Sequence, residues 1–155
     1  MLGVTKGTAY GIASGMAAGL IMAGIGYLLP IPMMKDHPPF FVNAIEMWGI
    51  PSFVVIGWIL HLLTSAVAGG VFGLLATRFA TFGVRTPARF VAWGITIGAV
   101  MWFFFFLPVE IPPMPMLSSM GDFLAESLGY NIAFGLVLAG LLSFVTRRSA
   151  TPSTQ

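Results

Sequence analysis

The chain has 155 residues, of which 57% are hydrophobic and only 8% are charged. Soluble domains carry about 25% charged residues, and a domain this small keeps most of its residues in contact with solvent. Water is therefore excluded as the main solvent, and one membrane-embedded domain is expected over residues 1–155. The net charge of +2 comes from scattered cations, so no nucleic-acid partner is expected. The absence of Cys excludes disulfides and thiolate metal sites.

Four apolar stretches are each long enough to cross the hydrocarbon core of a bilayer, which takes about 20 residues of helix. They cover residues 8–29, 52–77, 90–107 and 123–145, with bounds good to a few residues. A helix satisfies its backbone hydrogen bonds within one segment, as the lipid interior requires. The expected fold is therefore all-α, an integral membrane four-helix bundle, and residues 149–155 are expected to form a short tail.

The loop after the first span contains a further helical pattern over residues 39–49. In this segment Phe41, Ala44, Ile45 and Trp48 share one helical face. The pattern predicts a short interfacial helix that lies in the first extracytoplasmic loop.

The cations indicate which way the spans point, because short loops rich in Lys and Arg stay on the cytoplasmic side. Only Lys35 falls on the opposite side. The others flank the spans on one side and are Lys6, Arg78, Arg85, Arg89, Arg147 and Arg148. Both termini are therefore expected in the cytoplasm, with the bilayer itself as the first partner of the chain.

The two halves of the chain follow one plan, which predicts a duplicated transmembrane helical hairpin. Each half has a span, a proline-rich outer segment that contains Met, and a second span that ends in Arg. The outer segments begin at Leu29-Pro30 and at Leu107-Pro108, and the second spans end at Thr77-Arg78 and Thr146-Arg147.

A ridge of small residues runs along the first span. Glycine recurs at every fourth position, which puts these residues on one helical face: Gly7, Gly11, Gly15 and Gly19. Such a ridge lets another helix backbone approach closely, which is how helices associate in lipid. We refer to these four residues as the glycine ridge.

Polar residues inside the spans are few, and ionisable groups at membrane depth are often functional. His61 lies in the second span, with Thr64 and Ser65 one turn later. Glu126, Tyr130 and Asn131 open the fourth span and would form one polar pocket with His61 if those helices touched. A proton relay and a purely structural contact are both consistent with His61. No catalytic residue is expected, because hydrolase and nucleotide-binding motifs are absent from the sequence.

The outer loops concentrate thioethers, which prefer Cu(I). The candidate ligands of an extracytoplasmic copper site are Met33, Met34, His37, Met114 and Met116. The alternative is that these Met side chains fill irregular gaps. Otherwise no cofactor is expected, and a haem is conceivable only if two chains share it through their His61 residues.

A resemblance adds to these patterns. The Gly-rich first span runs into Pro30, and the second span reads Trp58-Ile59-Leu60-His61-Leu62-Leu63-Thr64-Ser65, followed by Gly69, Gly70, Phe72 and Gly73. This combination resembles a loose group of small prokaryotic four-helix inner-membrane proteins of unknown function. The resemblance implies architecture and location in the inner membrane without an activity, and it attaches no role to His61.

Three functions follow from these residues, and none of them is enzymatic. The first is a structural or accessory subunit that forms a homo-oligomer or joins a larger membrane complex through the glycine ridge and the bulky stretch 101–107. The second is a pathway for ions, protons or small solutes, with His61 and Glu126 as polar stations. The third is copper handling outside the cytoplasm.

Overall fold

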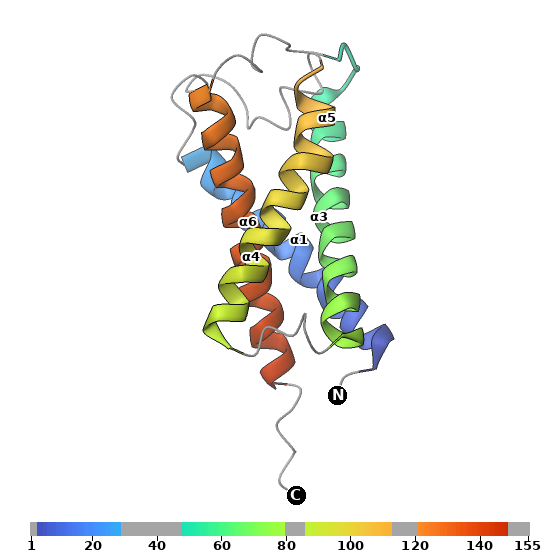
Figure 1. Ribbon diagram of the computed structural model, residues 1–155. Helices are drawn as coiled ribbons and strands as arrows, with labels where there is room; N and C mark the ends of the chain where they lie inside the picture. Colours follow the sequence, from blue (N-terminus) through green and yellow to red (C-terminus); the bar gives the residue numbers. More distant parts are fainter. Residues whose placement is uncertain (1–2, 29–47, 80–85, 113–120, 149–155) are drawn as a thin grey trace, which may run out of the picture.

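The computed structural model describes residues 3–28, 48–79, 86–112 and 121–148. The chain is all-α, and its elements are α1 (Val4–Leu28), α3 (Phe53–Arg78), α4 (Pro87–Met101), the π-helical segment η3 (Trp102–Phe106), α5 (Leu107–Glu110) and α6 (Gly121–Arg148). Within the described residues, four helical rods are long and apolar enough to cross a membrane, the third being α4, η3 and α5 together. The expected bundle of four membrane spans is confirmed (Figure 1).

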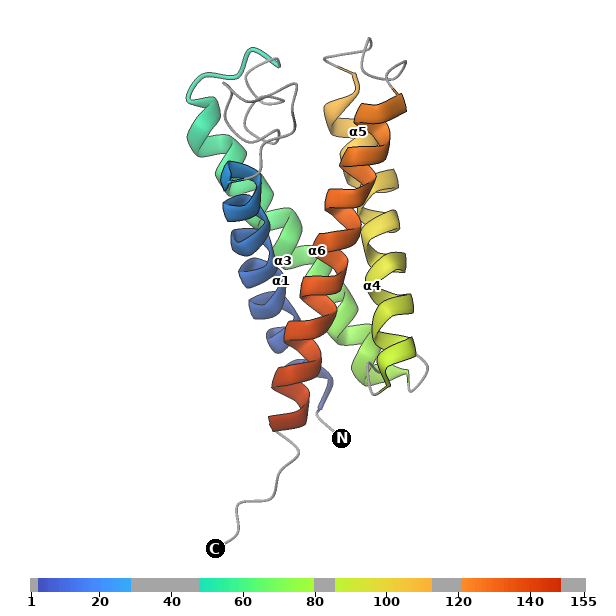
Figure 2. The same ribbon diagram turned by 90° about the vertical axis from the view of Figure 1, so that its left-hand side faces the viewer.

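The helices form two pairs, α1 with α3 and α4 with α6. Helix α1 also packs against α6, whereas α3 and α4 touch little. The start of α1, the end of α3, the start of α4 and the end of α6 lie at one end of the bundle (Figures 1 and 2). The chain is therefore a small four-span membrane protein built from two hairpins.

The helices extend a few residues beyond the expected spans. Helix α4 begins at Pro87 rather than at residue 90, because Thr86 caps it by accepting a hydrogen bond from the backbone N–H of Arg89 at 3.3 Å. Thr followed by Pro is a helix-start signal, since Pro suits the first turn. Helix α6 runs from Gly121 to Arg148, past the expected end at residue 145.

The third span was expected to end at Leu107, but the helix continues to Glu110. Proline inside a helix has no N–H to donate, and its ring clashes with the carbonyl four residues earlier, which for Pro108 is that of Phe104. The chain widens by one π-type turn just before Pro108, and the N–H of Leu107 bonds to the carbonyl oxygen of Trp102. This wider turn carries the helix past the proline.

The glycine ridge of α1 lies directly against α3. A Cβ added to Gly11 would meet the carbonyl oxygen of Gly69, and a Cβ added to Gly15 would meet that of Ser65. The ridge therefore closes the first hairpin. The sequence suggested that another chain associates through this ridge, but that expectation is wrong, because α3 already covers it.

The second hairpin closes in the same way. A Cβ on Gly135 of α6 would meet the carbonyl oxygen of Gly94 on α4, and a Cβ on Gly98 would meet that of Asn131. Backbones this close gain many van der Waals contacts, which drive helix association where the solvent is lipid. Glycine is thus required at the centre of both helix pairs.

A common core joins the two hairpins. It contains one or more buried side chains from each of the four helices, including Ala18, Phe72, Met101 and Leu138. The outward surface is apolar too, with Leu20, Ile59 and Phe104 among its exposed residues. A helix that is apolar on all faces suits a lipid environment. The expected interfacial helix and the tail lie outside the described residues, except for Trp48 and Gly49, which form a turn.

Candidate functional site

His61, the ionisable group expected inside the second span, lies between α3 and α1. Its Nε2 atom is 3.0 Å from the carbonyl oxygen of Gly19. Because a carbonyl oxygen only accepts, Nε2 donates this hydrogen bond. The ring also stands edge-on to Trp58, with centroids 6.2 Å apart. The imidazole therefore links the two helices of the first hairpin.

The neighbouring hydroxyl groups point into the same hairpin or back to their own helix. Ser65 is buried, and a Cβ added to Gly19 would come within 2.5 Å of its Oγ atom. Thr64 donates to the carbonyl oxygen of Leu60 in the preceding turn, at 2.8 Å. These groups are thus held within the protein.

The second hairpin carries its own polar contact. The indole N–H of Trp102 donates to Ser127 Oγ at 2.8 Å, and that hydroxyl donates in turn to the carbonyl oxygen of Leu124 at 2.9 Å. The Asn131 amide donates to the carbonyl oxygen of Ser127, also at 2.9 Å. Sequence reasoning missed Trp102 and Ser127, although a buried indole N–H needs an acceptor.

The structure does not bring the six polar candidates into one pocket. Helices α3 and α6 stand apart at the end that carries His61 and Glu126 (Figures 1 and 2). His61 contacts α1, Glu126 is exposed, and Tyr130 packs against the hydrophobic core. The polar groups are therefore divided between the two hairpins.

The expected copper ligands, Met33, Met34, His37, Met114 and Met116, all lie outside the described residues. Within the described residues, His, Asp and Glu form no group of three or more that would hold a metal ion. The copper site stays a prediction from the sequence.

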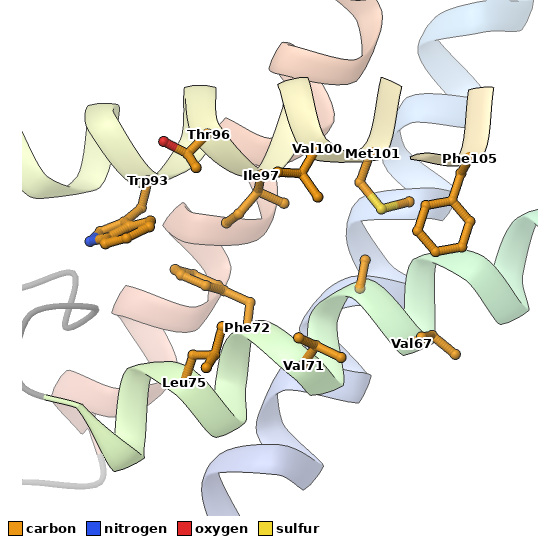
Figure 3. A pocket seen from close by; sticks show the side chains of 11 residues that line it. Val67, Val71, Phe72, Leu75, Trp93, Thr96, Ile97, Val100, Met101 and Phe105 are labelled. Carbon is orange, nitrogen blue, oxygen red and sulfur yellow. The ribbon is translucent and has the colours of Figure 1, made fainter. Parts of the chain in front are cut away.

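A groove lies between α3 and α4, where the two hairpins touch little. It has a volume of about 240 Å³ and an apolar lining (Figure 3). The α3 wall consists of Val67, Ala68, Val71, Phe72 and Leu75. The opposite wall consists of Trp93, Thr96, Ile97, Val100, Met101 and Phe105.

The groove is open at its rim. Phe72 and Trp93 approach each other across it, with ring centroids 6.4 Å apart. Val71 and Val100 on the rim are about half exposed, which opens the groove to the surrounding lipid. Sequence reasoning missed this groove, because the residues that line it are apolar like those on the other faces of the same helices, so no change in polarity marks them.

Comparison of the chain with protein-family models, curated proteins and solved structures found no match. The four helices that are long and apolar enough to span a membrane are thus shown by the chain's own structure, and the resemblance to a group of inner-membrane proteins stays a prediction. What this chain does is inferred from its geometry.

Proposed function

We propose that the chain is a non-enzymatic structural or accessory subunit of a membrane assembly. One observation carries this proposal: the imidazole of His61 is bonded to the Gly19 carbonyl between two helices. A side chain used in this way stabilises the bundle, whereas a solute pathway needs polar groups that converge on a shared cavity. The polar contacts of Ser127 and Asn131 in the second hairpin support the same conclusion.

The surface left for association is the aromatic stretch of η3. Phe103 and Phe104 are 59% and 64% exposed, and their rings are in edge-on contact with centroids 5.1 Å apart. Large aromatic side chains supply extensive contact area at low entropic cost. Since α3 occupies the glycine ridge, this aromatic surface is the proposed site of contact with another membrane-spanning chain or a second copy.

The proposed architecture includes an internal duplication. One offset along the chain relates Gly11 to Gly94 and Gly15 to Gly98, and a second offset relates Gly69 to Gly135. These residues make corresponding backbone contacts in the two hairpins. The same offsets relate the Gly19–His61 hydrogen bond to the Trp102–Ser127 hydrogen bond.

The proposed location is the inner membrane, with both termini in the cytoplasm. Lys6, Arg78 and Arg89 are at the end of the bundle where α1 and α4 begin, and Asp122 and Glu126 are at the other end, where α6 begins (Figure 1). The positive-inside tendency supports this orientation.

Native mass spectrometry of the full chain, extracted in mild detergent, tests the proposed association. We expect an assembly heavier than the single 16.5 kDa chain by at least one further polypeptide. The double variant Phe103→Ala/Phe104→Ala should release the single chain. The matched variant Val55→Ala/Ile59→Ala, at exposed positions of α3, should leave the assembly intact. A wild-type chain that carries no other polypeptide would overturn the proposal.

A further inference from the structure

The groove between α3 and α4 occupies a particular place in the two-hairpin arrangement. If α4 and α6 repeat α1 and α3, the counterpart of the α3–α4 junction is the α6–α1 junction. Helices α1 and α6 pack against each other, whereas α3 and α4 leave an open groove of about 240 Å³. The chain therefore fills one junction with its own side chains and leaves the other unfilled.

The lining of the groove suits a hydrocarbon chain. Its polar side-chain groups are the indole N–H of Trp93, near one end, and the hydroxyl of Thr96, which is already bonded to the carbonyl oxygen of Ala92 at 2.8 Å. A bound water needs two or more polar partners, which such a lining does not offer. With a rise of about 1.5 Å per residue, the α3 wall from Val67 to Leu75 is about 12 Å long, and the opposite wall from Trp93 to Phe105 is about 18 Å long.

One arginine lies just beyond each wall at the same end of this groove. Arg78 follows Leu75 by three residues on α3, and Arg89 precedes Trp93 by four residues on α4, so each arginine shares a helical face with a lining residue. Both arginine side chains are exposed. At the same end, the indole nitrogen of Trp93 is on the side of the ring away from Phe105 (Figure 3). The site is apolar along its length and cationic at one end.

We propose that the α3–α4 groove binds an anionic phospholipid. One acyl chain lies along the groove between Val71 and Val100, and the phosphate meets Arg78 and Arg89. Guanidinium groups bind phosphate through paired, charge-assisted hydrogen bonds, and basic residues at a membrane surface attract anionic lipids. This inference does not depend on association through Phe103 and Phe104.

Native mass spectrometry with defined lipids tests the headgroup contact. The full chain is delipidated in detergent and incubated with equal amounts of phosphatidylglycerol and phosphatidylcholine. We expect the wild type to retain phosphatidylglycerol in preference, and Arg78→Gln and Arg89→Gln each to reduce that preference about fivefold. Lys6→Gln removes a cation of α1 at the same end of the bundle and should leave the preference for phosphatidylglycerol unchanged. Equal retention of both lipids by the wild type would overturn the proposal.

A second pair of variants tests the acyl chain's position. Val71→Phe fills the groove and should lower retention of both lipids at least fivefold, while Val55→Phe, at an exposed position of α3 that does not line the groove, should leave it unchanged. Circular dichroism and a single elution peak confirm that each variant is folded. The assignment would be contradicted if Val71→Phe left lipid retention unchanged. It would also be contradicted if this variant released a second protein chain instead of lipid.

Discussion

Gly11 of α1 and Gly69 of α3 exclude each other's side chains: a Cβ on either residue would meet the carbonyl oxygen of the other. The obstacle is backbone on both sides, so no side-chain rotation relieves it. Two helices in lipid gain little from apolar burial, and close backbone contact supplies most of their attraction. This reciprocal contact is therefore what holds the first hairpin closed.

The Gly69→Ala variant should be less stable than the wild type by about 1–3 kcal/mol, the usual cost of overpacking. Gly24→Ala is the matched control, since a Cβ at this exposed position of α1 has no atom within 4 Å. Alanine favours helix over glycine by about 0.5–1 kcal/mol, so this control should be neutral or stabilising. Thermal unfolding in detergent, monitored by circular dichroism, measures the stability of both variants. If the two substitutions changed stability equally, the close contact would be contradicted.

The second hairpin should respond in the same way if it repeats the first. Gly135→Ala, which would direct a Cβ at the Gly94 carbonyl oxygen, should also cost about 1–3 kcal/mol. Gly129→Ala on the same helix faces open space and should not destabilise. Denaturant titration of the two variants is the measurement. A harmless Gly135→Ala would count against a shared packing plan.

The His61→Leu variant removes the donor to the Gly19 carbonyl. Hydrogen bonds between membrane helices contribute about 0.6 kcal/mol on average, so a small loss of stability is expected. Because the proposed role is structural, proton flux into liposomes that contain the protein, read with a pH-sensitive dye, should not differ between wild type and variant. A flux that the wild type shows and the variant lacks would revive the proton-pathway hypothesis.

The Ser127→Ala variant removes the acceptor of the Trp102 indole N–H. The indole N–H is partly buried, and a donor left without its partner inside the protein costs about 1–3 kcal/mol, so this variant should be less stable than His61→Leu. Thr146→Val, which removes a hydroxyl of α6 bonded to the carbonyl oxygens of Leu142 and Ser143 in its own helix, serves as the comparison. Thermal unfolding distinguishes the two, and a Ser127→Ala variant as stable as the wild type would show that this contact contributes nothing.

Much of this fold could be read from the sequence, because a lipid solvent imposes a strong signal. Runs of about 20 apolar residues gave the four spans, and glycine at every fourth position marked the packing face of α1. The partner of that face was not predictable, since Gly69 and Gly73 lie in a sequence where glycine is frequent. The π-type turn before Pro108 was not predicted either, because proline usually signals the end of a helix.

The polar residues were easier to find than to connect. His61 stood out as an ionisable group at membrane depth, but nothing in its spacing indicated the backbone carbonyl of Gly19 as its partner. Glu126 was grouped with it on the assumption that their helices touch. The groove between α3 and α4 depends on how far two helices stand apart, and a one-dimensional pattern does not contain that information.

The central claim is that these four helices cross a bilayer, and the proposed orientation puts both ends of the chain on its cytoplasmic side. Since the chain has no Cys, single cysteines introduced by Thr86→Cys, Ser52→Cys or Val71→Cys can be labelled with a membrane-impermeant maleimide in intact cells. We expect labelling of the Ser52→Cys variant alone. The Thr86→Cys variant should react only after the membrane is opened, and the Val71→Cys variant should stay protected within the bilayer. Labelling of Thr86→Cys or Val71→Cys in intact cells would contradict the account.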